Sequence, residues 1–313
     1  MNSLKISLNG TFGKLGSPYS SFYSPDLMLA VTMTGQLNLM CLIYDLEFRP
    51  DITVISANTD GIMVRYPASL RDKVLRVIKA NALRTGFEYE ETAYQTVALK
   101  DVNNYVAITA DRAPVVIAPD GTITEGKASG GKAKRKGLYA SNRPEENPLY
   151  LMKNPTFEIC SDAAIEYLKN GTDVGETIRA CTDIRRFVAI RTVKGGAIQF
   201  DHMIEVDDWF EVEKGMWSHE GKTTKPVKRV SRPKPRKVGV GGTDVGRVAR
   251  WYMSSASPCP ISYVLSGNKV PDTDGAMLCM TLPDEMPSDV DYEWYERRAM
   301  NILVDIGVIN MSS

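Results

Sequence analysis

The sequence has very little histidine and no paired cysteines. Its 313 residues include only His202 and His219, so a catalytic or metal site built on imidazole is not expected. The five cysteines lie far apart and form no Cys-x-x-Cys pair. That spacing excludes the usual pattern of a zinc site and of a disulfide framework. It favours reduced, buried thiols, and hence a cytoplasmic location.

The sequence also shows no pattern typical of a secretion signal or of a membrane span. We find no charged-then-apolar leader ending in small residues, as a secretion signal would have. The most apolar stretch, residues 27–48, is interrupted by polar side chains. These are Thr32, Thr34, Gln36, Asn38, Asp45 and Glu47. We therefore expect this stretch to form a buried helix of a globular protein, with no membrane partner.

Net charge is zero, from 38 basic and 38 acidic residues, which by itself argues against a nucleic-acid partner. The charges are nevertheless segregated. Residues 222–237 hold eight Lys or Arg and residues 127–136 hold five, with no acid in either stretch, whereas acids gather in 205–213 and 284–296. A basic groove along a phosphate backbone has this pattern. A solvated basic loop has it too, so both interpretations stay open.

The periodicity of apolar residues predicts a mixed α and β protein. The chain is long enough for two domains, and its 43% hydrophobic and 24% charged residues are typical of a globular protein. Residues 222–246 are rich in Pro, Gly and Lys. This composition predicts a loop or mobile segment, or the ends of two strands with a loop between them. Helices are predicted at 4–12, 24–48, 69–85, 157–168 and 291–306, and strands at 52–55, 62–66, 96–109 and 115–123.

One predicted helix carries an unusual stripe. Lys5 and Asn9 are four residues apart, and Phe12 follows Asn9 by three, so all three lie on one helix face. A cation, an amide and an aromatic ring are a poor core pattern. They suit a nucleotide, because the cation can meet a phosphate while the flat ring meets a base pair.

A second segment places a carboxylate at a hairpin tip. Asn58-Thr59-Asp60-Gly61 has turn composition and lies between two β-rich runs. A carboxylate on such a turn is well placed to hold a hard cation such as Mg²⁺. Asp and Gly also favour turns for backbone reasons alone, so the turn by itself is equally compatible with a purely structural role.

Residues 5–13 resemble motif B of the family B DNA polymerases, Lys-x-x-x-Asn-Ser-x-Tyr-Gly. Lys5, Asn9 and Gly13 match that pattern, with Gly10 in place of the Ser and Phe12 in place of the Tyr. The resemblance implies that Lys5 binds the triphosphate and assists catalysis. It also implies that Asn9, Phe12 and Gly13 bind the nucleotide beneath the nascent base pair.

Residues 58–61 resemble motif C of the same family, Asp-Thr-Asp-Ser on a β-hairpin, in a form similar to a bacteriophage branch. The order of the two motifs, and the long helix between them, are also as in the family. The resemblance implies two-metal nucleotidyl transfer with two Mg²⁺ ions. Asp60 would be the catalytic carboxylate that touches both ions. Asn58, an uncharged ligand, replaces the other motif C carboxylate.

Later segments extend the resemblance over nearly the whole chain. Residues 100–105 resemble a primer-contacting Lys-Lys-x-Tyr strand, with Asn103 and Asn104 in place of the lysines. Residues 134–138 resemble the segment that leads into the thumb, and residues 291–295 resemble the start of a late thumb helix. The DNA contacts that this implies are Thr59, Lys100, Tyr105, Lys132, Lys134, Arg135 and Lys136. Weaker thumb candidates are Arg185, Arg186, Arg191 and Lys194.

The family's fold implies an α+β chain, with an antiparallel palm sheet and packed helices followed by a mainly helical thumb. Residues 1–17 would end the fingers, 18–146 would form a palm fragment and 147–313 the thumb. Primer–template DNA and dNTP would be the partners. No Asp in the chain has the context of motif A, so we also expect an upstream polypeptide that carries motif A and the exonuclease domain. The chain alone should be inactive as a DNA-directed DNA polymerase.

Two other interpretations remain open. One is a non-catalytic polymerase remnant that binds nucleic acid without chemistry. The other is an α+β protein with a surface interaction role. A carboxylate at the hairpin tip favours the enzyme, because a binding module has no need of a metal ligand there.

Overall fold

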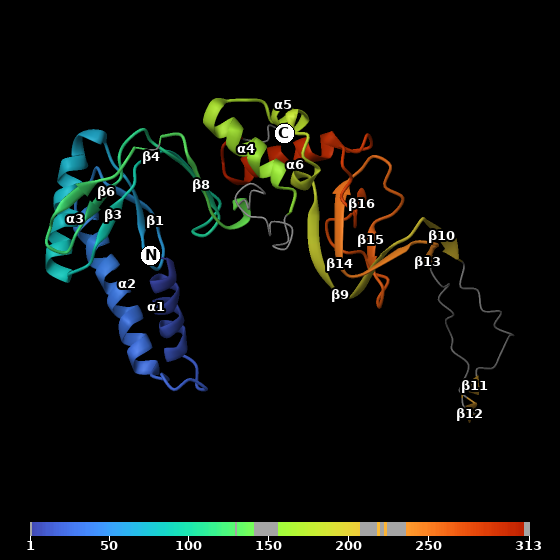
Figure 1. Ribbon diagram of the computed structural model, residues 1–313, viewed down its shortest axis with the longest axis horizontal. Helices are drawn as coiled ribbons and strands as arrows, with labels where there is room; N and C mark the ends of the chain where they lie inside the picture. The colour runs from blue at the N-terminus through green and yellow to red at the C-terminus, as the bar shows by residue number, and fades with distance from the viewer. Residues whose placement is uncertain are drawn as a thin grey trace. The chain divides into compact units, whose positions relative to one another are not determined.

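The computed structural model describes residues 2–128, 130–140, 156–206, 218–219, 222–223 and 236–309. The chain divides into two compact units, Met1–Leu138 and Tyr139–Ser313 (Figure 1). Each unit combines helices with antiparallel sheets, which confirms the α+β class. The predicted boundary at 146/147 lies outside the described residues.

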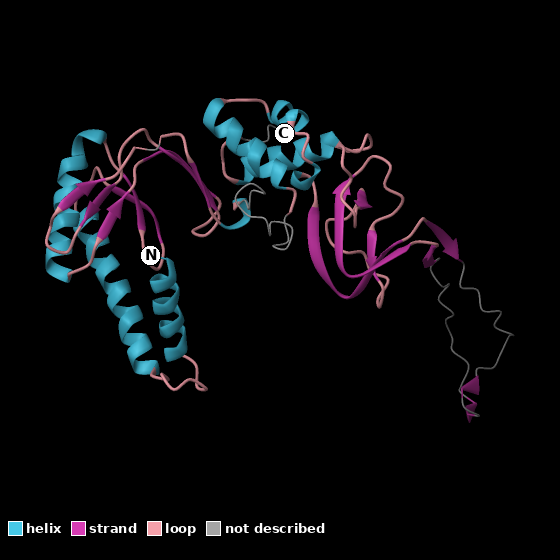
Figure 2. Ribbon diagram, viewed as in Figure 1, coloured by secondary structure: helices cyan, strands magenta, loops and turns pink. Residues whose placement is uncertain are grey.

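The first unit opens with two helices that run side by side, α1 (Asn2–Leu15) and α2 (Pro25–Glu47) (Figure 2). The Ser24 N–H donates a hydrogen bond to the Leu15 carbonyl at 3.0 Å, which joins the end of one helix to the start of the other. Pro25 begins α2, as its fixed φ allows. A third helix, α3 (Arg71–Thr85), follows the short turn η1 (Ala68–Leu70) and ends at Gly86, whose φ is 74°.

Three small antiparallel sheets complete the first unit. The predicted strands 96–109 and 115–123 are each interrupted by a turn, so each region contributes two strands rather than one. The short turn η2 (Gly137–Tyr139) follows the last strand. The sheets are β1 (Thr53–Ala57) with β2 (Ile62–Arg65); β3 (Tyr89–Glu91), β6 (Val115–Ile117) and β7 (Ile123–Glu125); and β4 (Tyr94–Leu99), β5 (Tyr105–Thr109) and β8 (Ala133–Arg135).

The core of this unit lies at one end of α2. Leu42 and Leu46 pack with Ile52 and Val74, and they are the only buried residues of α2 within the described chain. The prediction of a buried helix over 27–48 is therefore wrong for most of its length. The prediction of buried thiols is likewise wrong for Cys41, which is exposed on this helix. Among the described helices, α2 is also the one that is long and apolar enough to cross a membrane.

The second unit contains the largest sheet, in the order β15-β9-β14-β16. Its strands are β9 (Ala189–Gln199), β14 (Thr243–Met253), β15 (Ile261–Tyr263) and β16 (Ala276–Leu278). Two further ribbons pair β10 (His202–Val206) with β13 (Arg236–Val240) and β11 (Ser218–His219) with β12 (Lys222–Thr223).

Helices α4 (Glu158–Asn170), α5 (Val174–Ala180) and α6 (Tyr292–Asp305) pack against one another in this unit. Predictions of helices at 157–168 and 291–306 are confirmed. The described part of the unit is nevertheless mixed rather than mainly helical. Glycines at Gly195, Gly196 and Gly246 adopt positive φ and accompany irregular pairing of β9 with β14, so the alternation that marks a strand is broken in the sequence.

Candidate functional site

Asp60 lies on the exposed turn between β1 and β2, as the sequence predicts. The Asn58 N–H donates to the Gly61 carbonyl at 2.9 Å. The Asp60 N–H donates to Asn58 Oδ1 at 3.2 Å. The side chain of Asn58 thus closes the turn in the manner of an Asx-turn. The Asp60 carboxylate forms no hydrogen bond or ion pair with another described residue, so it is available to a ligand.

A single Mg²⁺ fits this turn better than a pair does. Mg²⁺ is usually held by one or two carboxylates, with water and substrate phosphates completing six oxygens. Asp60 supplies one carboxylate, and Asn58 can add at most the lone pair that the turn leaves free. No cluster of three or more His, Cys, Asp or Glu side chains suited to a metal exists within the described ranges. A second ion therefore requires a carboxylate from elsewhere.

The Asp60 turn borders a cavity of about 910 Å³ between α2, the β1–β2 hairpin and strands β3 and β4. We call it the hairpin cavity. Residues 59–61 line it together with Gly35 and Asn38 of α2. The turn and the middle of α2 therefore face one space, although the sequence separates them by more than twenty residues.

A polar network lies beside the hairpin cavity. Asn38 Nδ2 donates to the Tyr89 hydroxyl at 2.6 Å, and that hydroxyl donates to Asn81 Oδ1 at 3.0 Å. Asn38 Oδ1 and Asn81 Nδ2 have no hydrogen-bond partner among the described residues. The network ties α2 to α3 and β3, and it holds Asn38 at the cavity wall.

The predicted nucleotide-binding residues lie on α1, and Asn9 and Phe12 are exposed. The side chain of Lys5 lies outside the described part of the structure. A Cβ added at Gly10 or Gly13 would meet nothing within 4 Å. Glycine inside a helix costs about 1 kcal/mol relative to alanine. Packing within the described chain does not account for either glycine.

The helix pairing brings the start of α1 toward the hairpin cavity. Lys5 precedes Leu15 by ten residues, and Thr34 follows Ser24 by ten. Because Leu15 and Ser24 are joined and the helices are antiparallel, the backbone of Lys5 lies roughly level with Thr34. Thr34 is next to Gly35, which lines the cavity. Proximity of the Lys5 amine to the Asp60 carboxylate remains a prediction.

Several predicted DNA contacts fall on one sheet face. Lys134 is the central residue of β8, and Lys132 and Lys136 flank the strand in continued pairing with β5, so the three side chains share a face, and all three are exposed. Lys134 pairs with Ala107 of β5, and Tyr105 is two residues from Ala107, so it lies on the same face. We call Tyr105, Lys132, Lys134 and Lys136 the basic face. Arg135 points to the other side of the strand.

Lys134 is held in place on the basic face. Its Nζ donates to the Tyr94 hydroxyl at 3.1 Å and lies 5.9 Å from the centre of that ring. Burial lowers the pKa of Lys134, but the hydrogen bond to Tyr94 and nearby Tyr105 and Glu90 outweigh it and raise the pKa overall. Lys134 is therefore a cation at neutral pH.

The neighbouring residues Asn103 and Asn104 have different surroundings, and the side chain of Asn104 has a structural role. Asn104 Oδ1 accepts from the Leu138 N–H at 2.7 Å, and Asn104 Nδ2 donates to Asp101 Oδ2 at 2.7 Å. This side chain fastens the turn after the exposed Lys100 to η2, which follows β8. Gly137, at φ 61°, completes the contact because a Cβ there would overlap Asn103 and Asn104. Sequence reasoning missed this role.

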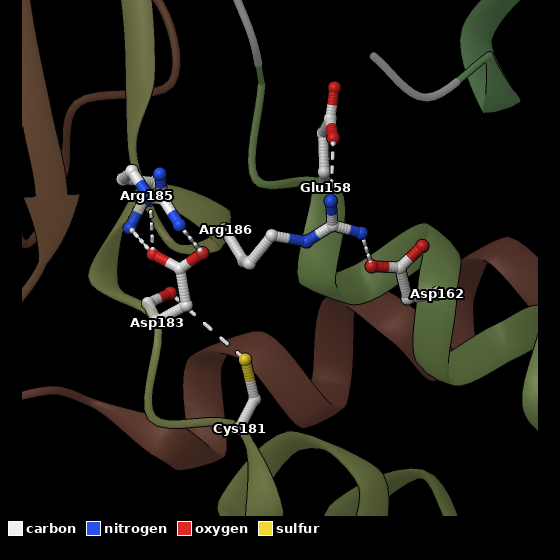
Figure 3. Close-up of polar contacts among 6 residues, drawn as sticks. All are labelled: Glu158, Asp162, Cys181, Asp183, Arg185 and Arg186. Atoms are coloured by element: carbon white, nitrogen blue, oxygen red, sulfur yellow. Dashed lines mark hydrogen bonds and ion pairs between the residues drawn. The ribbon is translucent and has the colours of Figure 1, made fainter. Parts of the chain in front are cut away.

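The arginines proposed for the thumb are already paired (Figure 3). Arg186 is only 8% exposed. It lies between Glu158, at 3.4 Å, and Asp162. Arg185 bonds both carboxylate oxygens of Asp183 at 2.8 Å. The prediction of Arg186 as a phosphate contact is wrong, because its guanidinium is buried and forms ion pairs with Glu158 and Asp162.

The remaining thumb candidates differ in accessibility. Arg191 donates to the Pro271 carbonyl at 3.0 Å and lies 3.7 Å from Asp272, whereas Lys194 is exposed. Most of the basic stretch 222–237 lies outside the described residues.

No family model matches the sequence, and no curated protein matches it. The resemblance to polymerases therefore rests on the residues of the motifs.

Proposed function

We propose that this chain is the C-terminal portion of a family B DNA polymerase, carrying the end of the fingers, part of the palm and the thumb. The observation that carries the proposal is the Asp60 turn. An unpaired carboxylate stands at the tip of a two-stranded hairpin, on the wall of a cavity shared with α2. Helix α1, which carries the nucleotide-binding pattern, runs beside α2, and its start lies roughly level with the part of α2 that borders the cavity.

The proposed reaction is attack of a primer 3′ oxygen on the α-phosphate of a dNTP. A phosphorus–oxygen bond to the primer forms, the proton of the 3′ hydroxyl passes to solvent, and the bond to the leaving pyrophosphate breaks. Mg²⁺, when bound, would neutralise charge on the phosphates and lower the pKa of the attacking hydroxyl. Asp60 would hold the ion with one carboxylate. Lys5 would neutralise charge on the triphosphate.

The other residues would position the substrates. Asn9 and Phe12 are exposed on α1, where an amide and a flat ring can contact the nascent base pair. Gly13 leaves open space that such a pair can occupy. The basic face would hold primer and template phosphates, since three exposed cations on alternate strand residues match a backbone contact.

The site is incomplete with one carboxylate. Two like-charged ions a few ångströms apart need more negative charge than Asp60 provides. We propose that a polypeptide carrying motif A supplies it. The test is primer extension with Mg²⁺, by this chain alone and together with the product of the upstream reading frame. We expect extension only when this chain and the upstream polypeptide are combined. Robust extension by this chain alone would contradict the proposal that its metal site lacks a carboxylate.

A second candidate function, nucleic-acid binding without chemistry, is favoured by the basic face, which does not depend on Asp60. The same assay separates the two. If the pair binds primer–template DNA but does not extend it under any metal condition, the chain is a binding remnant.

A further inference from the structure

Helix α2 has two apolar faces, and only one packs against its own unit. Gly35, Leu39, Leu42 and Leu46 face the hairpin cavity and the core. On the opposite side an exposed row follows the spacing four, four, three, four. It consists of Leu29, Met33, Leu37, Met40 and Tyr44, whose exposed fractions are 61%, 44%, 53%, 63% and 72%. We call this row the outer stripe.

The outer stripe has the form of a helix-docking seam. Residues at these spacings stay on one side of a helix, and the fifteen steps from Leu29 to Tyr44 extend about 22 Å. No Lys, Arg, Asp or Glu lies between Asp26 and Asp45, so nothing charged interrupts the row. A helix that is apolar on all sides is normally covered, and within the described residues nothing covers this side.

Charge at the two ends of the stripe indicates what covers it. Asp26 precedes Leu29 by three residues, and Glu47 follows Tyr44 by three, so both acids lie on the stripe's own face. Both are exposed. The apolar row is therefore closed by a negative charge at each end.

These acids disfavour pairing with a second copy of the same chain. An antiparallel pair would set Leu29 against Tyr44 and thus Asp26 against Glu47. A parallel pair would set each acid against itself. Either orientation opposes like charges, whereas Lys or Arg at both ends of a partner would be attracted.

We propose that the outer stripe docks an amphipathic helix of another polypeptide, with an apolar row at matching spacing and a basic residue beyond each end. Apolar contact would supply affinity, and the paired end charges would fix the register. The inference stands on α2 alone, so it holds whether or not the chain takes part in nucleotidyl transfer.

The test uses the full chain and two synthetic helical peptides. Both carry leucine at the stripe's spacing. One has lysine three residues beyond each end of the row, and the other has glutamate there. By fluorescence anisotropy at low salt, the lysine peptide should bind about tenfold more tightly than the glutamate peptide. The lysine peptide forms an exposed ion pair at each end of the stripe, whereas the glutamate peptide places like charges there. The preference should shrink as salt rises.

Variants make the test specific. Asp26→Lys with Glu47→Lys should reverse the preference between the peptides. Leu37→Glu with Met40→Glu should abolish binding of both. Val31→Glu is the matched control, because Val31 is 51% exposed on the same helix but lies off the stripe, and it should change little. Circular dichroism of each variant checks that the helix is intact.

Three results would overturn the proposal. The first is equal binding of the two peptides, or a preference between them that Asp26→Lys with Glu47→Lys leaves unchanged. The second is a concentration-dependent dimer of the chain alone that Leu37→Glu abolishes, because the occupant would then be a second copy. The third is binding to phosphatidylcholine vesicles that Leu37→Glu abolishes, because the occupant would then be a lipid surface.

Discussion

Asn58 Oδ1 accepts a hydrogen bond from the backbone N–H of Asp60 at 3.2 Å, so the side chain of Asn58 builds the turn that presents the Asp60 carboxylate. An aspartate at position 58 can accept the same hydrogen bond and would add a charge. Asparagine therefore preserves the shape of the turn while weakening its attraction for a cation.

The first prediction follows from that hydrogen bond. Asn58→Asp should keep the turn and bind Mg²⁺ more tightly. Asn58→Ala should lose the turn contact and lower the free energy of unfolding by about 1 kcal/mol. Urea denaturation and Mg²⁺ titration of both variants measure these effects. Equal Mg²⁺ affinity of Asn58→Asp and the unaltered chain would show that the turn holds no cation.

The second prediction separates packing from substrate contact on α1. Alanine in place of Gly10 or Gly13 meets open space and should stabilise the helix by about 0.5–1 kcal/mol. If Gly13 faces the nascent base pair, Gly13→Ala should also slow primer extension by the pair of polypeptides. Gly10, which is also open and lies on the same helix, provides the matched control, and Gly10→Ala should retain activity. Equal activity of both variants would remove Gly13 from the site.

The third prediction concerns the basic face. Each lysine that contacts a phosphate contributes close to one unit to the slope of log affinity against log salt. Lys134→Ala with Lys136→Ala should therefore reduce that slope by about two for primer–template DNA, measured by fluorescence anisotropy. Lys73→Ala with Arg76→Ala removes two charges from α3 and should leave the slope unchanged. Equal losses for the two pairs would indicate general charge attraction rather than a defined face.

The fourth prediction concerns Gly137. A Cβ at this position would overlap Asn104 in a left-handed backbone conformation, so Gly137→Ala should lower the free energy of unfolding by about 2 kcal/mol or more. Gly131 also has a positive φ, 72°, but its Cβ position is open. Gly131→Ala should cost only about 1 kcal/mol. Equal costs in thermal denaturation would mean that the Asn104 contact does not hold this segment.

Local signals made the first unit largely predictable. Ser24 and Pro25 mark the start of α2, and Gly86 marks the end of α3. The Asp60 turn was also predictable, because Asn, Asp and Gly between β-rich runs favour a hairpin. These features depend on residues that are close in the sequence.

Features that depend on distant contacts were not predictable. The exposure of α2 depends on what packs around it, which an apolar pattern does not reveal. The role of Asn104 depends on Leu138, thirty-four residues away. Strands β9 and β14 lack a clear alternation because glycines with positive φ interrupt them. The pairing of Arg186 likewise depends on Asp162, which precedes it by twenty-four residues.

The most direct test of the central claim is primer extension with Mg²⁺ by the pair of polypeptides, comparing Asp60→Asn with the unaltered chain. Asp51→Asn is the control, because Asp51 is also an exposed aspartate in a turn at the hairpin. Asp60→Asn should abolish extension and leave DNA binding nearly unchanged, while Asp51→Asn should extend normally. Full extension by Asp60→Asn would contradict a catalytic role for Asp60 and with it the proposed function of the hairpin.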